Sequence, residues 1–299
     1  MKQTNIKKEL ALMLALSTLW GASYSFIKIG VETIPPLSLI AGRTLIAAVL
    51  LTAILKVRGV TLPNGAAIWG KFLVQASLNS AIPFTLIAWA EQSTDAGIAT
   101  ILNATTPIFA FLLTALLTRH DPVNRRKLCG VATGIAGASL IVGLQAMAGV
   151  GHQLWAELAI LAASGCYGGA AIFGRHFRGL DPMIPATGSI LCGAALLVPA
   201  SLAIDRPWTL NPSADSVLAL FALSSLSTAL AFVIYFRLLQ TLGSVGTTAQ
   251  AYLRVPIGVA ISVLFLRESV TPAAGFGLVA VVAGVAAMTI PAPRAPATR

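Results

Sequence analysis

The sequence predicts an all-α membrane protein with ten transmembrane helices, built as two inverted repeats of five helices with both termini in the cytoplasm. Composition, the number of apolar runs and an internal repeat support this prediction. Of the 299 residues, 57% are hydrophobic and 10% are charged, and the mean hydropathy is +0.85. Soluble domains average roughly 45–50% and 25%. This composition excludes an ordinary soluble globular enzyme.

Apolar runs follow one another along almost the whole chain. Proline, glycine or charged residues separate them, and each run has about 18–25 residues, enough to cross a bilayer core of about 30 Å. We therefore expect ten membrane helices, followed by a disordered proline-rich tail over 291–299. The expected helices comprise residues 10–30, 37–55, 69–90, 96–118, 128–146, 154–174, 182–203, 216–239, 245–266 and 272–290.

The positions of the basic residues predict the orientation. With a cytoplasmic N-terminus, fifteen Lys and Arg residues fall on the cytoplasmic side and only Lys28, Arg206 and Arg267 fall outside. The remaining two, Arg43 and Arg254, lie within the apolar runs. Because basic residues accumulate on the cytoplasmic side of membrane proteins, this bias places both termini there. It also explains the net charge of +10 without a nucleic-acid partner.

An internal repeat divides the chain into two predicted domains, 9–147 and 153–290. A shift of about 148 residues aligns apolar runs with apolar runs and also matches glycine, proline and aromatic positions. Because each repeat has an odd number of spans, the second must enter the membrane upside down, as in many secondary transporters. The matched positions include Trp20-Gly21 with Tyr167-Gly168, Phe84 with Phe232, Pro107 with Pro256 and Gly134 with Gly284.

Several short motifs are distributed over the two repeats. The first repeat has Trp20-Gly21, Phe26, Lys28, Pro36, Arg43 and Thr106-Pro107, and the second has Pro256 followed by Phe265-Leu266-Arg267-Glu268. With these residues the whole chain resembles the drug/metabolite transporter superfamily with tandem EamA-type domains, and within it the YddG-type amino-acid exporters.

This resemblance implies a ten-helix exporter of small metabolites, in which helices one to four and six to nine surround a central cavity and helices five and ten lie outside. One departure is the end of the first repeat, Thr118-Arg119-His120-Asp121, which lacks the acid that Glu268 supplies in the second.

Arg254 is the strongest candidate for a substrate contact. It lies near the middle of the ninth run, two residues before Pro256, and a guanidinium there could hold a carboxylate through two parallel hydrogen bonds. The alternative is a structural pairing with a helix carbonyl or with Glu91 or Glu157. Pro107 and Pro256 are predicted to break helices four and nine and so to form gates.

Buried amides and aromatic residues extend this candidate cavity. Each intramembrane amide needs a partner, so these residues either line a polar cavity or bond neighbouring helices. Amphipathic aromatic residues with a central cation would suit zwitterions with apolar or aromatic side chains. The candidates are Asn79, Asn103 and Gln250 among the amides, and Trp20, Tyr24, Tyr167 and Tyr252 among the aromatics.

Other conspicuous residues have structural interpretations. Arg43 and Lys28 lie near the outer ends of their runs, where long basic side chains reach toward the interface, so we expect both to be anchors. The GxxxG spacings at Gly130 and Gly134, and at Gly165 and Gly169, predict faces where helices pack closely.

The sequence contains no HExxH or GxSxG motif and no close pair of carboxylates within an apolar run. We therefore expect no enzymatic activity, no cofactor and no metal. The predicted partners are a small-molecule substrate and the lipid bilayer, and no feature sets an oligomeric state. The expected function is export of amino acids or related metabolites across the inner membrane by alternating access. A passive channel, a drug exporter and a membrane-embedded transferase are the alternatives.

Overall fold

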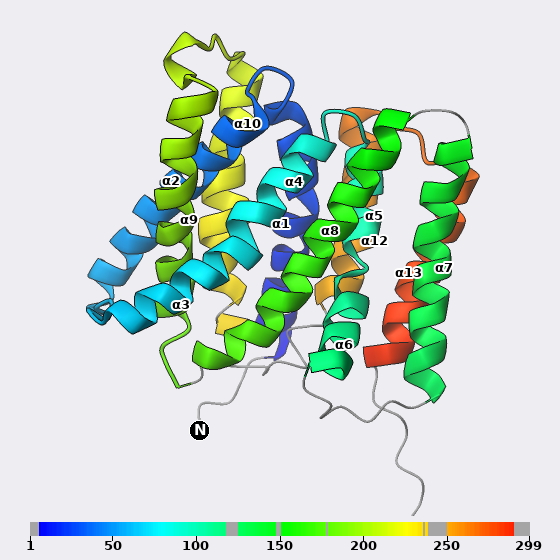
Figure 1. Cartoon of the computed structure of the whole chain (residues 1–299), viewed down its shortest axis with the longest axis horizontal. Coiled ribbons are helices and arrows are strands. Elements are labelled where there is room, and N and C mark those ends of the chain that lie inside the picture. Colours follow the sequence, from blue (N-terminus) through cyan, green and yellow to red (C-terminus); the bar gives the residue numbers. More distant parts are fainter. Residues whose placement is uncertain are drawn as a thin grey trace, which may run out of the picture.

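A computed structural model describes residues 6–117, 125–147, 151–177, 179–235, 237–238 and 250–289. Within these residues all regular structure is helical and no strand occurs, which confirms the predicted all-α class. The helices form one bundle (Figure 1). The predicted tail, 291–299, lies outside the described residues.

The first repeat folds as five helical segments, two of which are interrupted. The third segment contains a stretch of π-helix, η1, and the fourth contains a two-residue turn at Ala104 and Thr105. Pro36 begins α2, where the missing N–H has no intrahelical partner to lose, whereas Pro83 follows η1 in the interior of the third segment. The elements are α1 (Ile6–Gly30), α2 (Pro36–Val57), α3 (Ala66–Ala76), η1 (Ser77–Ala81), α4 (Ile82–Ala90), α5 (Ala96–Asn103), α6 (Thr106–Leu117) and α7 (Arg125–Met147).

The second repeat follows the same order. Its third segment again contains a π-helical stretch, η4, after which residues 231–235 return to α-helix. The elements are α8 (Gly151–Phe173), η2 (Gly174–Phe177), α9 (Met183–Ile204), η3 (Pro207–Thr209), α10 (Ala214–Ser224), η4 (Ser225–Leu230), α12 (Gln250–Leu266) and α13 (Pro272–Thr289).

Among the described residues, seven helical segments are long and apolar enough to cross a membrane. Shorter apolar stretches of 10–17 residues lie in α7, α12 and α13. Large apolar side chains such as Phe265 and Phe276 are more than two-thirds exposed, as expected for a surface that faces lipid rather than water. The chain is therefore a multi-pass membrane protein.

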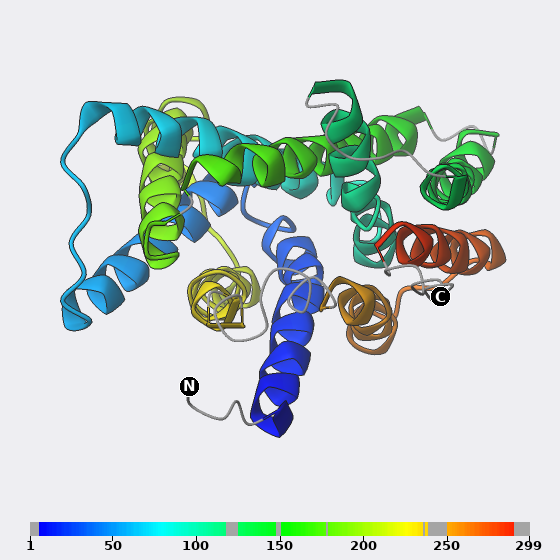
Figure 2. The same cartoon turned by 90° about the horizontal axis from the view of Figure 1, so that it is seen from below.

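Helix packing relates the two repeats. Helix α1 packs against α10 and α12 of the second repeat, and its counterpart α8 packs against α4 and α6 of the first. The pairs α2 with α9 and α7 with α13 each join counterparts directly. Helices α1 and α8 run in opposite directions (Figure 1), and α7 and α13 lie to one side of the remaining helices (Figure 2).

The glycine spacings have mixed outcomes. Helices α7 and α13 approach so closely that a Cβ atom at Gly284 would lie 2.5 Å from the carbonyl oxygen of Gly130 and 2.7 Å from the nitrogen of Gly134. Close packing at the first spacing is thus confirmed. At Gly165 and Gly169 a Cβ atom would lie 3.7 and 3.8 Å from its neighbours, which is an ordinary van der Waals distance. The prediction of close packing at this second spacing is therefore wrong.

The two expected proline breaks also differ. Helix α5 ends at Asn103 and α6 begins at Thr106, so the first repeat is broken just before Pro107. Helix α12 instead continues through Pro256 from Gln250 to Leu266. The expected break at Pro256 is therefore absent: helix α12, which packs along α1, continues despite the hydrogen bond that proline removes.

Candidate functional site

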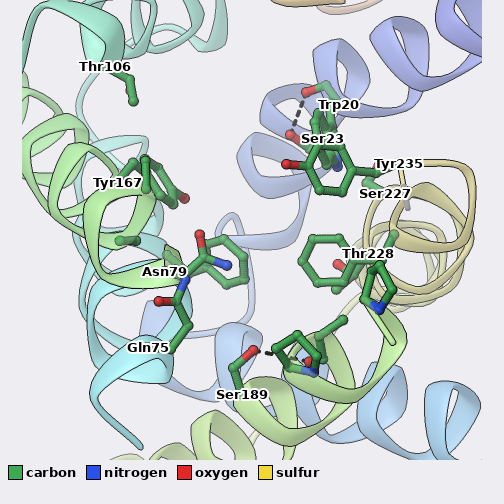
Figure 3. Close-up of a pocket in the computed structure, with 18 of the residues that line it drawn as sticks. Trp20, Ser23, Gln75, Asn79, Thr106, Tyr167, Ser189, Ser227, Thr228 and Tyr235 are labelled. Atoms are coloured by element: carbon green, nitrogen blue, oxygen red, sulfur yellow. Dashed lines mark hydrogen bonds between the residues drawn. The ribbon is translucent and has the colours of Figure 1, made fainter. Parts of the chain in front are cut away.

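A cavity of about 750 Å³ lies at the centre of the bundle, between the two repeats (Figure 3). Asn79, Gln75 and Tyr167 line one side of it, and Trp20 and Tyr235 face them across the open space. Six of the eight predicted site residues line this cavity: Trp20, Tyr24, Asn79, Asn103, Tyr167 and Arg254. The other two, Gln250 and Tyr252, lie in the first turn of α12, and their side chains are outside the described part of the chain.

The lining follows the internal repeat. Residues 147 or 148 positions apart contribute to opposite walls, so one set of positions, used twice, builds most of the cavity. The sequence comparison identified Trp20 with Tyr167 and Phe84 with Phe232 as repeat partners. Further partner pairs in the lining include Asn79 with Ser227, Ile87 with Tyr235 and Ser23 with Ala170.

Both π-helical stretches, which the sequence analysis did not predict, lie at this cavity. Segments η1 and η4 occupy equivalent positions of the repeats and carry Asn79 and Ser227 to its walls. A π-helical turn inserts one extra residue and redirects the side chains after it, and such turns are frequent at functional sites. The sequence signals are weak: Pro83 soon follows η1, and a run rich in Ser and Thr forms η4.

Arg43 lies in the cavity wall rather than at the membrane interface, so its prediction as an anchor is wrong. Its side chain is only 5% exposed. Its Nε donates a hydrogen bond of 3.0 Å to Oγ1 of Thr228, and its guanidinium carbon lies 3.7 Å from the ring centre of Phe84. These contacts stabilise the buried cation by hydrogen bonding and by the electrostatic attraction of the aromatic face.

Arg254 has no hydrogen-bond or ion-pair partner among the described residues, and its Nε atom is buried. The alternative pairing with Glu91 or Glu157 is absent, because the carboxylate oxygens of both acids also lack partners within the described structure. A half-buried guanidinium without a counter-ion is available to bind an anion that enters the cavity.

Asn103 has the interhelical role that the sequence analysis left open. Its Nδ2 donates to the hydroxyl of Tyr24 on α1, and its Oδ1 accepts a hydrogen bond of 3.0 Å from Ser164 on α8. Thr106 donates to the same oxygen at 3.3 Å. Asn103 therefore satisfies polar groups where α5 gives way to α6, and also lines the cavity.

All formal charges in the described lining are positive. Arg43, Arg175 and Arg254 line the cavity, and no Asp or Glu is among the described residues that do so. In the same part of the chain, no three His, Cys, Asp or Glu side chains gather where a metal could bind. The arrangement favours anion binding.

The cavity reaches one end of the bundle, which we call the terminal end because α1 begins and α13 ends there (Figure 1). The segment that joins α8 to α9 lies at this end. The residues of this segment that line the cavity are Gly174, Arg175, Phe177, Gly179, Leu180 and Pro182. Arg175 in this segment is exposed. The cavity is therefore accessible from the terminal end.

Carboxylates of the second repeat close the opposite, far end. Both oxygens of Glu268 accept hydrogen bonds from the first N–H groups of α5, Ala96 at 2.8 Å and Gly97 at 2.9 Å. At the start of α2, Oδ2 of Asp205 accepts from the N–H of Ser38 at 2.8 Å and from its hydroxyl at 2.7 Å. Each contact places a negative group at the positive end of a helix of the other repeat.

Lys28 takes part in the same closure and is not a lipid anchor. Its ammonium donates hydrogen bonds to the carbonyl oxygens of Glu91 at 2.7 Å and Thr94 at 2.9 Å. Burial raises the pKa of Glu91 well above its usual range, although the charge of Lys28 opposes this effect. Burial also raises the pKa of Asp95, and Glu268 nearby adds to the increase.

Several proteins with similar sequences are named as transporters. The uncharacterized inner membrane transporter YedA of Escherichia coli K12 is 29% identical over 255 residues, which cover 83% of this chain and 79% of YedA. A "probable terminal-alkyne amino-acid exporter" of Streptantibioticus cattleyicolor is 27% identical over 281 residues, which cover 92% of this chain and 91% of that protein. The uncharacterized transporter YoaV of Bacillus subtilis is 24% identical over 246 residues, covering 82% and 84%.

A solved structure shares the fold, with a TM-score of 0.64 and 18% identity over 94% of this chain and 97% of that one. The profile of the EamA-like transporter family matches twice, at residues 7–143 and at residues 154–290. Members of this family are transporters and not enzymes. Because the two matches together span nearly the whole sequence, the chain belongs to the EamA-like transporter family and carries two copies of its domain.

Proposed function

We propose that this protein exports amino acids or related small metabolites across the inner membrane by alternating access. In this proposal ten spans form two inverted repeats of five, and both termini are cytoplasmic. The central observation is a cavity built from equivalent positions of both repeats, with Arg254, which has no partner among the described residues, in its wall. Such a site between inverted repeats is typical of secondary transporters.

The positive-inside rule assigns the terminal end to the cytoplasm. Lys56, Arg58 and Lys71 lie in or beside the connection between α2 and α3 at this end, and Arg175 lies at the mouth of the cavity. The structure then corresponds to an inward-facing state that loads substrate from the cytoplasm. Release outside requires the contacts of Asp205 and Glu268 at the far end to separate.

The choice of amino acids rests on Arg254 and on one relative. A guanidinium is suited to a carboxylate, because two parallel N–H donors match its two oxygens. The Streptantibioticus cattleyicolor relative, a "probable terminal-alkyne amino-acid exporter", supports the same substrate class. Trp20 and Tyr167 on facing walls offer ring surfaces to the remainder of the substrate.

Export by Arg254 variants tests the proposal. We expect Arg254→Ala to abolish export of labelled amino acids from loaded cells while the protein stays in the membrane. Arg254→Lys should retain part of the activity, since a point charge replaces the planar fork. Arg58→Ala, an exposed cation outside the cavity, is the matched control. Full export by Arg254→Ala would exclude the substrate contact.

Counterflow in proteoliposomes separates a carrier from a passive channel. A carrier exchanges labelled external substrate for unlabelled internal substrate and saturates, whereas a pore does neither. Flux that rises linearly with concentration and shows no counterflow would contradict alternating access.

A further inference from the structure

We infer that the preferred substrates of this cavity are small dicarboxylic acids, with or without an amino group, whose two carboxylates bind Arg43 and Arg254. The inference rests on the proposed transport function and narrows its substrate class. It follows from the number, placement and pairing of the charges in the cavity.

The two arginines lie in the wall of one shared cavity. Both line the cavity, Arg43 from α2 in the first repeat and Arg254 from α12 in the second. Arg43 lies over the ring of Phe84, and that ring lies 6.4 Å from the ring of Tyr167, which also lines the cavity. Because both guanidinium groups border one continuous cavity, a single bound molecule can be approached by both charges.

Neither cation is neutralised by a carboxylate. The ion pair between Arg237 and Glu9 is the one recorded among the described residues, and it involves neither arginine. Arg43 uses its Nε for Thr228 and one face of its guanidinium for Phe84, both of which are uncharged. Two like charges in a low-dielectric cavity repel, so a ligand with two negative groups relieves more electrostatic free energy than a ligand with one.

The arginines also break the internal symmetry of the lining. Two pairs of repeat partners in the cavity match closely in character, Trp20 with Tyr167 and Phe84 with Phe232. Arg254 instead corresponds to Thr105 in the register that pairs Pro107 with Pro256, and the position equivalent to Arg43 is Leu191. The positive charges are thus features of this cavity that the repeat does not require.

A zwitterionic substrate fits this charge pattern less well. Its ammonium group would add a positive charge beside Arg43 and Arg254, and no described lining residue supplies a carboxylate to pair with it. An acidic amino acid has a net negative charge, and its second carboxylate can pair with the second arginine. Arg175 at the mouth attracts anions toward the same path.

Binding of a matched ligand pair to the wild-type protein tests the inference without any substitution. Glutamate and glutamine have nearly the same size and differ in the second carboxylate. Trp20 lines the cavity, so quenching of tryptophan fluorescence in detergent, absent in a Trp20→Phe variant, reports occupancy. We expect glutamate and succinate to bind about tenfold or more tightly than glutamine and leucine. Equal or tighter binding of glutamine and leucine would overturn the inference.

Counterflow with the same ligands distinguishes the inference from the function on which it rests. Exchange of glutamate and succinate, lost in Arg43→Gln and Arg254→Gln, partly kept in the Lys variants and unchanged in Arg58→Gln, is the expected result. If leucine or phenylalanine exchanges and the dicarboxylates do not, the dicarboxylate inference fails and the transport proposal stands. If none of these substrates exchanges, both fail.

Discussion

Gly21 on α1 touches the backbone of Gly258 on α12. A Cβ atom at Gly21 would lie 3.0 Å from the nitrogen of Gly258 and 3.1 Å from the carbonyl oxygen of Arg254. The repeat reproduces this crossing at Gly168, where a Cβ atom would lie 2.8 Å from the nitrogen of Ala110. Gly21 and Gly168, which are 147 residues apart, thus allow the first helix of each repeat to pack closely against the fourth helical segment of the other repeat.

Alanine at either glycine should destabilise the protein. Because the opposing atoms are backbone, a methyl group at Gly21 or Gly168 must push two helices apart, at a cost of about 1–3 kcal/mol. Thermal unfolding in detergent measures the loss as a lower Tm. Gly70→Ala is the control, because a Cβ atom there meets nothing within 4 Å. Unfolding of Gly21→Ala and Gly168→Ala at the same temperature as Gly70→Ala would contradict close helix contact.

The sequence predicts the regular helices closely and the features that interrupt them poorly. Residues 37–55 and 182–203 were expected as helices, and Pro36–Val57 and Met183–Ile204 are observed. Apolar length is a local property, so it locates a span. The π-helical segments η1 and η4 depend on packing against other helices, and the local sequence marks them only weakly.

The candidate site shows the same division. The type of each residue and its position within an apolar run were enough to select six residues that line the cavity. Arg43 was assigned to the interface because its distance from a helix end is visible in the sequence, whereas its contacts with Phe84 and Thr228 join positions far apart in the chain. The roles of Lys28 and Glu268 at the far end were missed for that reason.

Neutralising Glu268 should favour opening of the far end. Glutamine at this position keeps the size of the side chain but removes the negative charge at the start of α5, which is worth about 1–2 kcal/mol. We expect about tenfold faster labelling, from outside, of a cysteine placed at Ser227 in the cavity. The measurement uses an impermeant maleimide in a protein with its three native cysteines replaced.

Glu32→Gln removes an exposed charge in the connection between α1 and α2 and serves as the control for Glu268→Gln. Labelling from outside that is equally slow in both variants would show that the Glu268 contact does not hold the far end closed.

Glu91→Gln should change how stability depends on pH. Burial raises the pKa of Glu91 in the folded protein above the value of about 4.3 in an unfolded chain, so folding favours the protonated acid. This contribution is fully present below pH 4.3 and is lost as the pH rises through the raised pKa. The groups whose charges act on Glu91 or its neighbourhood are Lys28, Arg43, Asp95 and Glu268.

Glutamine cannot ionise, so the Tm of Glu91→Gln should decline less than that of the wild-type protein between pH 5 and pH 8. Glu32→Gln should follow the wild-type curve, because Glu32 is exposed. A steeper decline in Glu91→Gln would mean that Glu91 is ionised and stabilising in the folded protein.

Thr228 should be required to position Arg43. Its hydroxyl donates a hydrogen bond of 2.9 Å to the carbonyl oxygen of Leu223 in the π-helical region and accepts the bond from Nε of Arg43. Thr228→Val keeps the shape and removes both bonds, leaving a buried donor unpaired at a cost of about 1–3 kcal/mol. We expect a lower Tm and weaker substrate binding, with Thr228→Ser restoring both. Thr18→Val, which removes an exposed hydroxyl bonded to Leu14, is the control. If Thr228→Val binds substrate as the wild-type protein does, Arg43 is held by Phe84 alone or does not contact substrate.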